Sequence, residues 1–183
     1  QLTMKENVIR FSDVESCIIE LRDQRVLLDR DVAMLYDVET KEINQAVKNN
    51  PDKFPAGYLI ECNKVEKAEL VKNFDRFNPL KHSTALPTAF TEKGLYMLAT
   101  ILKSNKATQT TIAIVEAFAR IKELSRTVLQ LPTADEAQQK TLMQRTSELM
   151  ADLLDDEPKV TDSETTIELN LAVLKFKHMV KRG

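Results

Sequence analysis

Glycine and cysteine are scarce in this chain, and each scarcity excludes a class of site. Three glycines among 183 residues leave no Gly-rich phosphate-binding loop, and together with only six prolines they favour a helix-rich architecture. The two cysteines, Cys17 and Cys62, lie far apart and form no CxxC or Cys/His cluster of the kind that zinc requires. His82 and His178 have no carboxylate or cysteine at metal-ligand spacing beside them. We therefore expect no disulfide framework, no metal and no cofactor.

The sequence also lacks a dominant charge sign and a long apolar run. Lys plus Arg number 26 and Asp plus Glu number 28, so the net charge of -2 excludes a globally basic nucleic-acid-wrapping protein. No apolar run approaches the roughly 18 residues of a membrane span, and no basic-then-apolar leader is visible. No catalytic motif such as G-x-S-x-G occurs. We expect a cytoplasmic protein that is not an enzyme, contacts no membrane and has no small-molecule substrate.

The hydrophobic pattern predicts an α+β fold that is mostly helical. Its core is a helix-turn-helix with a small β-hairpin or short sheet, followed by a C-terminal helical extension. We place the domain boundary at Pro132, which gives a domain over 1–130 and an extension over 131–183. The first expected elements are a hairpin over 17–29 with its turn at Asp23-Gln24, a helix capped by Asp29 and a second helix over 40–49. A strand over 58–62, a helix over 64–77 and a loop between Pro79 and Pro87 are expected next. The last expected elements are three helices, one over 91–102, one that begins at Asn105 and one over 134–154.

Residues 30–49 have the spacing of a helix-turn-helix. Ala33 is small enough for two helices to cross closely, and Asp37 occupies a turn position whose left-handed backbone suits Gly, Asn or Asp. Ile43 and Val47 then pack inward, with Val38 filling the gap between the helices. This arrangement turns one polar face outward, made of Thr40, Lys41, Asn44, Gln45, Lys48 and Asn49.

The residue types on this face suit double-stranded DNA. Asn and Gln pair with adenine edges in the major groove, and Lys and Thr serve bases or phosphates. The face is nevertheless neutral, since residues 39–53 carry three basic and three acidic groups, so nearby Arg22, Arg25 and Arg30 or a dimer must supply affinity. A pair of amphipathic helices used only as scaffold is the alternative. We expect Lys41, Asn44 and Gln45 at base edges, and Lys48, Arg30 and Arg25 at phosphates.

Two long stretches resemble a known family. Residues 21–55 read L-R-D-Q-R-V-L-L-D-R-D-V-A-M-L-Y-D-V-E-T-K-E-I-N-Q-A-V-K-N-N-P-D-K-F-P, and residues 86–104 read L-P-T-A-F-T-E-K-G-L-Y-M-L-A-T-I-L-K-S. They resemble the KilA-N-related DNA-binding domain of phage antirepressors, in the branch named after phage open reading frame six, over about residues 16–124. The resemblance implies a bacterial or prophage protein whose amino-terminal α+β domain binds DNA. It also implies a variable carboxy-terminal region, and several members act as antirepressors.

The chain departs from this family in one loop and keeps a signature after it. Relatives carry a Gly- and Arg-containing stretch where this chain reads N-P-L-K-H-S-T-A, so only Lys81 and His82 could replace a phosphate contact there. In the signature that follows, we predict that Thr91 caps a helix, that Phe90 staples its start, and that Gly94 permits close packing. This signature is interpreted as scaffold.

The helix expected over 134–154 carries an apolar stripe that needs a partner. Self-association into a dimer would place two recognition helices on one side, whereas packing back onto its own domain is the alternative. A third possibility is an interaction module that inactivates a phage or host repressor protein. After Pro158 the pattern is open between a strand and a helix begun by a Thr165-x-x-Glu168 capping box, and helix is favoured. The predicted oligomerisation residues are Leu142, Met143, Leu149, Met150 and Leu153.

Overall fold

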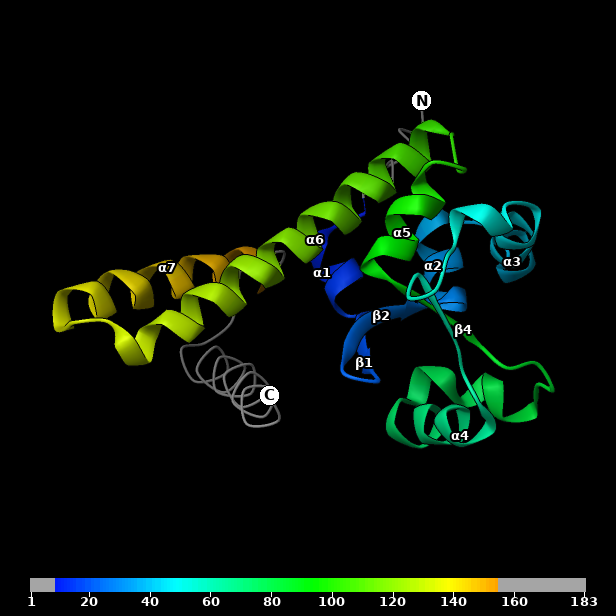
Figure 1. Cartoon of the computed structure of the whole chain (residues 1–183), viewed down its shortest axis with the longest axis horizontal. Coiled ribbons are helices and arrows are strands. Elements are labelled where there is room, and N and C mark those ends of the chain that lie inside the picture. Colours follow the sequence, from blue (N-terminus) through cyan, green and yellow to red (C-terminus); the bar gives the residue numbers. More distant parts are fainter. Residues whose placement is uncertain (1–8, 155–183) are drawn as a thin grey trace, which may run out of the picture. The chain divides into compact units, whose positions relative to one another are not determined.

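The protein is mostly helical and contains one four-stranded antiparallel sheet, as the hydrophobic pattern predicts (Figure 1). The computed structural model describes residues 9–154. The chain forms two compact units, and the division between them falls after Val115, inside the long helix α6 (Asn105–Gln130). The first unit holds the sheet and the predicted helix-turn-helix, and the second holds the end of α6 together with α7 (Glu136–Leu154).

The sheet has the order β1-β2-β4-β3, and every neighbouring pair is antiparallel. The hairpin predicted over 17–29 is confirmed, but its turn is formed by Arg22 and Asp23, with φ angles of 50° and 60°. Two left-handed residues match the right-handed twist of a two-residue hairpin, so the turn lies one residue before the predicted Asp23-Gln24. The strands are β1 (Ile19–Leu21), β2 (Gln24–Leu28), β3 (Leu59–Glu61) and β4 (Thr88–Thr91).

Strand β4 was not predicted, although it is a central strand of the sheet. It pairs Phe90 with Leu27 of β2 on one side and with Leu59 of β3 on the other. Its four residues are too few to show the alternation that marks a strand, and its partners lie far away in the sequence. The expected loop between Pro79 and Pro87 is also partly helical, because the 3-10 helix η2 extends to His82.

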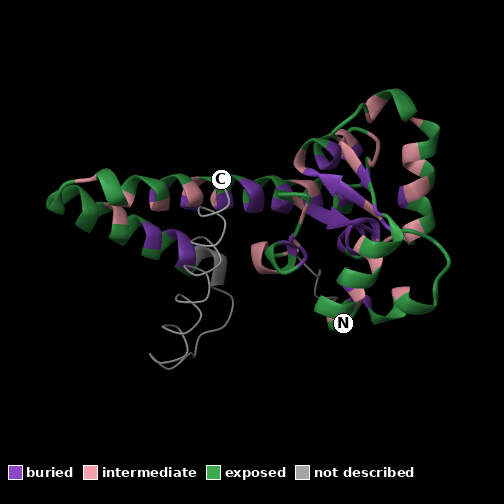
Figure 2. Ribbon diagram, turned by 60° about the horizontal axis from the view of Figure 1, so that its bottom comes forward, coloured by how far each residue is buried: buried purple, intermediate pink, exposed green. Residues whose placement is uncertain are grey.

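Both faces of the sheet are covered where its central strands pair, because residues 26–28 of β2 and 89–91 of β4 are all buried (Figure 2). On one face, Val26 and Leu28 pack with Ile60, Leu70 and Phe77 in one hydrophobic cluster. Leu27 and Phe90 point the other way, since side chains alternate along a strand, and α2 and α5 contact the central strands. The sheet therefore fixes the position of α2, the first helix of the predicted DNA-binding motif.

The predicted helices are present, and three boundaries need correction. Asp29 is the first residue of α2, not its cap. Helix α4 ends at Asn73, not near Phe77, because an extended backbone at Phe74 lets its ring pack edge-on against the buried Phe77. The remaining helices are α1 (Phe11–Glu15), α2 (Asp29–Tyr36), α3 (Thr40–Asn49), η1 (Pro51–Lys53), α4 (Lys64–Asn73), η2 (Asp75–His82), α5 (Glu92–Ala99, shorter than the predicted 91–102) and η3 (Leu131–Thr133).

The signature at the start of α5 has the structural role predicted for it. The Thr91 hydroxyl accepts a hydrogen bond from the Gly94 amide at 3.3 Å, which is an N-cap interaction. Gly94 itself faces the backbone of Tyr58, and a Cβ atom at this position would lie 2.1 Å from the Tyr58 carbonyl oxygen. The absence of a side chain at Gly94 is therefore what lets α5 approach the strand that follows Tyr58.

The second unit pairs α7 with the end of α6. Leu149 and Met150 are buried against Leu124 of α6, and Arg145 forms an ion pair with Glu123 at 2.6 Å. This part of the predicted apolar stripe is thus used inside the helical pair, which is the alternative raised for it above. Leu142 is half-buried and Met143 is 62% exposed. The side chain of Leu153 and everything predicted after Pro158 lie outside the described residues.

Candidate nucleic-acid interface

Helices α2 and α3 are joined by a tight turn centred on Asp37. Asp37 has a left-handed backbone, with φ 56° and ψ 47°, as its place in the motif predicts. The amide of Val38 donates to the Ala33 carbonyl at 3.0 Å, which closes the end of α2. The Lys106 ammonium contacts the Asp37 carboxylate at 2.5 Å and ties the turn to α6. Ala33 is buried and α2 contacts α3, as the predicted close crossing requires, while the crossing point at Ala33 itself stays a prediction.

Helix α3 presents a polar stripe to the outside of the first unit. Ile43 is fully buried beneath it and Val47 is half-buried, so Ile43 anchors the helix as predicted. Lys41, Gln45 and Lys48 are exposed and follow each other at the spacing of one helix face. We call these three residues the α3 stripe. Glu42 and Asn49 are also exposed. The side-chain oxygen of Asn49 accepts a hydrogen bond from the side-chain amide of Gln45 at 2.8 Å.

Asn44 does not share the exposed position predicted for it. Its side-chain amide is half-buried and donates to the Asp29 carboxylate at 3.0 Å. Asp29 is only 6% exposed and also accepts from the Arg30 amide at 2.9 Å. Asn44 therefore satisfies a buried carboxylate at the start of α2 and fixes α3 against α2. Asn44 thus has a positioning role within the domain, and its predicted contact with a base stays a prediction.

Asn44→Ala is expected to lower the free energy of unfolding by about 1–2 kcal/mol, because it removes one of two donors to a buried carboxylate. Gln45→Ala is the matched control, since Gln45 is the next residue along α3 and is exposed, and we expect it to change stability by less than about 0.5 kcal/mol. Urea unfolding followed by circular dichroism measures both values. Equal stabilities of the two variants would contradict the role assigned to Asn44.

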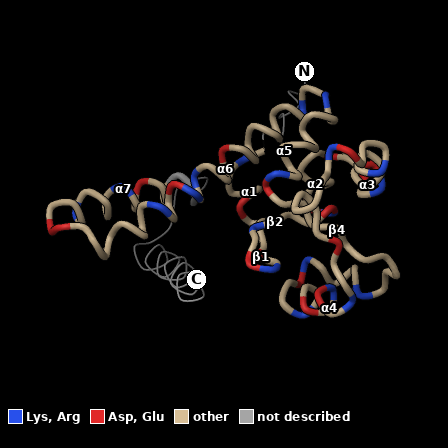
Figure 3. The backbone as a smooth tube through the Cα atoms, in the orientation of Figure 1, with Lys and Arg blue, Asp and Glu red and all other residues tan. Residues whose placement is uncertain are grey.

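The acidic residues at the start of α3 serve the helix itself. The Glu42 carboxylate accepts a hydrogen bond from the Glu39 amide at 3.2 Å, and negative charge is favourable at a helix N-terminus. Lys41 lies 2.7 Å from Glu39, but both side chains are largely exposed, so this ion pair is weak and exchangeable. The start of α3 therefore carries charges of both signs, from Glu39, Lys41 and Glu42, and Lys48 is the charged residue near its end (Figure 3).

The three arginines expected to add affinity have different environments. Arg22 forms a bidentate pair with Glu66, at 2.7 and 3.0 Å, which lowers the pKa of the Glu66 carboxyl. Arg25 is half-buried on β2, where burial lowers its pKa while the charges of Glu20 and Glu92 act against this shift. Arg30 is half-buried at the start of α2. Of the three, Arg30 lies beside α3, since it lines a pocket with residues of that helix.

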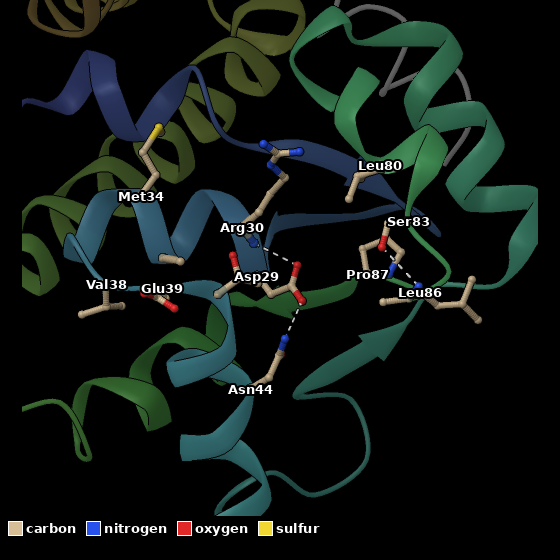
Figure 4. A pocket seen from close by; sticks show the side chains of 13 residues that line it. Asp29, Arg30, Met34, Val38, Glu39, Asn44, Leu80, Ser83, Leu86 and Pro87 are labelled. Carbon is tan, nitrogen blue, oxygen red and sulfur yellow. Dashed lines mark hydrogen bonds between the residues drawn. The ribbon is translucent and has the colours of Figure 1, made fainter.

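This pocket has a volume of about 540 Å³ and borders the α2–α3 motif (Figure 4). Thr40 and Asn44 line it from α3, and Arg30 and Met34 line it from α2. Its other wall is formed by Leu80 of η2 and by the segment between η2 and β4, and sequence reasoning did not place this part of the chain beside α2. The only signal for this wall was the departure from the family pattern at residues 78–85. The wall-forming residues are Leu80, Ser83, Ala85, Leu86 and Pro87.

The described part of the chain also bears on three other features: a metal site, a membrane-spanning helix and reactive cysteines. Between residues 9 and 154 there is no group of three or more His, Cys, Asp or Glu side chains that could hold a metal ion. None of the helices described there is long and apolar enough to cross a membrane. Cys17 and Cys62 are buried, unbridged thiols, and burial raises the pKa of each to about 11 from its ordinary value of 9.0.

Both thiols are therefore expected to react slowly with Ellman's reagent at pH 8, until the protein unfolds. Because folding raises their pKa, the unfolded chain loses these protons first as the pH rises. The free energy of unfolding should consequently fall between about pH 9 and pH 11. Stopped-flow thiol titration in the presence and absence of urea tests the first point, and rapid labelling of the folded protein at pH 8 would refute it.

Comparison with known families decides what this domain is. Residues 16–101 match the model of the ORF6N domain, which covers the whole sheet, the α2–α3 motif and α5. These residues form an ORF6N domain. The ORF6N domain is KilA-N-like and is found in phage antirepressor-type proteins, so the predicted resemblance is confirmed over residues 16–101, and the match does not extend to the predicted end near residue 124. No curated protein and no solved structure matches the chain.

Proposed function

We propose that the ORF6N domain binds double-stranded DNA through the α2–α3 motif, with α3 in the major groove. The observation that carries this proposal is the α3 stripe, in which Lys41, Gln45 and Lys48 lie exposed on one face above the buried Ile43. A helix fits the major groove, where an amide side chain pairs with adenine and an ammonium group reaches guanine or phosphate. Gln45 and Lys41 are assigned to base edges, and Lys48 and Arg30 to phosphates.

The remaining predicted contacts take lesser parts in this proposal. Thr40 lines the pocket beside α3, Asn49 borders the stripe, and Arg25 lies on β2 next to Glu20 and Glu92. Because the face is close to neutral, a single domain binds weakly, and two-fold association provides the affinity a regulator needs. We infer a phage- or prophage-type transcription regulator of antirepressor character, located in the cytoplasm and active as a dimer.

Fluorescence anisotropy with a mixed-sequence 30-base-pair duplex tests DNA binding by the full chain. We expect the logarithm of the binding constant to fall linearly with the logarithm of salt concentration, by about 0.9 for each phosphate neutralised. Absence of binding to this duplex at 50 mM salt, together with recovery of no duplex from a randomised pool, would refute the proposal.

A second candidate is an interaction module that binds and inactivates a repressor protein without reading DNA. It is favoured by exposed apolar side chains on the second unit, where Leu129 is 56% and Met143 is 62% exposed. These same residues are candidates for the dimer contact. Replacing both with lysine should shift the mass measured by analytical ultracentrifugation to that of a monomer, and an unchanged mass would exclude them from the dimer contact.

A further inference from the structure

The pocket beside α3 has two walls, and only one belongs to the α2–α3 motif. Arg30 and Met34 of α2 form the first wall, and the segment Ser83–Leu86 forms the second, with Asn44 between them (Figure 4). We call residues 81–86 the wall segment. From the sequence, a phosphate contact in this segment is considered only for Lys81 and His82, and the proposed function assigns the segment no role.

The wall segment is held in place without any ligand. The ammonium group of Lys67, on α4, donates to the Ser83 carbonyl and to the Ala85 carbonyl, the latter at 3.0 Å. The amide of Ala85 donates to the Ser83 hydroxyl at 3.2 Å. At the end of the segment, the buried Pro87 accepts a hydrogen bond from the Cys62 amide at 3.0 Å. Such an ordered segment loses little entropy when a ligand binds, so it is preorganised.

The exposed groups of the wall segment suit a nucleic-acid backbone. Ser83 lines the pocket with its hydroxyl group, and Lys81, His82 and Thr84, which are exposed beside it in the chain, offer ammonium, imidazole and hydroxyl donors next to the pocket. Leu86 is 45% exposed and faces the pocket, as does Met34, which is 61% exposed. Phosphate oxygens accept from the polar groups, while sugars and thymine methyl groups pack on the apolar ones. An all-apolar peptide groove would lack this row of donors.

The pocket is continuous with the proposed DNA contact, since Thr40 and Asn44 of α3 also line it. In helix-turn-helix complexes the first helix crosses the DNA backbone while the second lies in the major groove. With α3 in the groove, the adjacent strand passes α2 at Arg30, and the wall segment lies across the pocket from it. Two carboxylates line the pocket. Asp29 is only 6% exposed and accepts a hydrogen bond from Asn44, and Glu39 is exposed and lies 2.7 Å from the ammonium group of Lys41, which offsets its charge.

We propose that the wall segment is a second DNA contact, which binds the sugar-phosphate backbone beside α3, and that Lys67 is a positioning residue for it. This inference rests on the proposed function. Lys67 acts through the carbonyl groups that it holds and does not itself contact DNA. Loss of Lys67 therefore weakens the hold of the segment on the DNA backbone, including that of Lys81 and Ser83.

The first test compares Lys67→Met with Lys72→Met in the full chain. Lys72 is an exposed lysine on the same helix, so both variants lose one positive charge. With the mixed-sequence duplex, we expect Lys67→Met to bind about tenfold more weakly and to show a salt slope reduced by about 1 for each phosphate that the segment no longer binds. Lys72→Met should stay within twofold of the wild type. Equal affinities and slopes of the two variants would overturn the inference.

A proximity test does not depend on the stability of the Lys67 variant. Because Cys17 and Cys62 are buried, a cysteine introduced at the exposed Thr84 is the thiol that a photoactivatable reagent labels. Labelled Thr84→Cys should cross-link to the bound duplex, whereas labelled Lys72→Cys should not. Adding Lys67→Met to Thr84→Cys should reduce the cross-linked fraction several-fold. Equal cross-linking from positions 84 and 72, or none from position 84 while the duplex is bound, would overturn the inference.

These outcomes separate the inference from the proposal on which it rests. A wild-type chain that binds no duplex overturns both. A wild-type chain whose binding disappears when the α3 stripe is replaced, but which is indifferent to Lys67→Met and does not cross-link from position 84, overturns the second DNA contact alone.

Discussion

Replacing Lys41, Gln45 and Lys48 together with alanine is expected to weaken duplex binding at least about 100-fold. A specific base contact contributes about 1–3 kcal/mol, and the removal of phosphate-binding lysines brings the total to about 3 kcal/mol, which corresponds to this factor. All three side chains are exposed, and none of them anchors α3. The melting temperature should therefore stay within about 2 °C of the wild type, since surface substitutions seldom change stability by more than about 0.5 kcal/mol.

The matched control removes the same charge from other surfaces of the first unit. Lys64→Ala and Lys72→Ala on α4, combined with Gln109→Ala on α6, delete two lysines and one glutamine at exposed positions. Anisotropy titrations at one salt concentration should show this triple variant within about threefold of the wild type. If both triple variants lose affinity equally, binding depends on net charge and not on α3.

Gly94→Ala, which adds a single methyl group, is expected to lower the stability of the ORF6N domain strongly. The new Cβ atom would lie 2.1 Å from the carbonyl oxygen and 3.1 Å from the carbonyl carbon of Tyr58. This carbonyl cannot move freely, because it accepts hydrogen bonds from the amide and the hydroxyl of Thr91, at 3.2 and 3.0 Å. We expect the free energy of unfolding to fall by about 3 kcal/mol or more, at the upper end for overpacking.

Gly57→Ala provides the comparison at a glycine with open space around it. No atom lies within 4 Å of a Cβ at position 57, and the cost comes from its positive φ of 88°. Strain of this kind amounts to about 1–3 kcal/mol. Guanidinium unfolding of both variants should show the larger loss, or failure to accumulate folded protein, for Gly94→Ala. A Gly94→Ala protein as stable as Gly57→Ala would mean that α5 can shift away from β3 at little cost.

Local features of the α2–α3 motif could be predicted from the sequence because neighbouring residues determine them. The 3.6-residue period assigns Ile43 to the inside, where it is buried. Of the six residues assigned to the outward face, the α3 stripe and Asn49 are exposed, whereas Thr40 and Asn44 are half-buried. Asp37 occupies the left-handed turn because its short polar side chain tolerates that backbone. Thr91 caps α5 for an equally local reason, since its hydroxyl reaches the amide of Gly94.

Features that depend on distant partners escaped prediction. Strand β4 exists because Phe90 is paired on both sides by strands remote in the sequence. Asn44 turns inward because Asp29, on the other helix, needs a hydrogen-bond donor. The wall segment faces α2 because Lys67 holds its carbonyl groups from α4. None of these interactions leaves a periodic pattern in the sequence.

The placement of α3 in the major groove is tested most directly by the base preferences of a Gln45 variant. Duplexes are selected from a randomised pool with the wild-type chain and with Gln45→Arg, and the preferred base at each position of the site is compared. Glutamine pairs with adenine and arginine with guanine, so the preference should change from adenine to guanine at one position and stay the same elsewhere. A variant that still binds DNA with every base preference unchanged would show that Gln45 does not lie at a base edge and would contradict the proposed docking of α3.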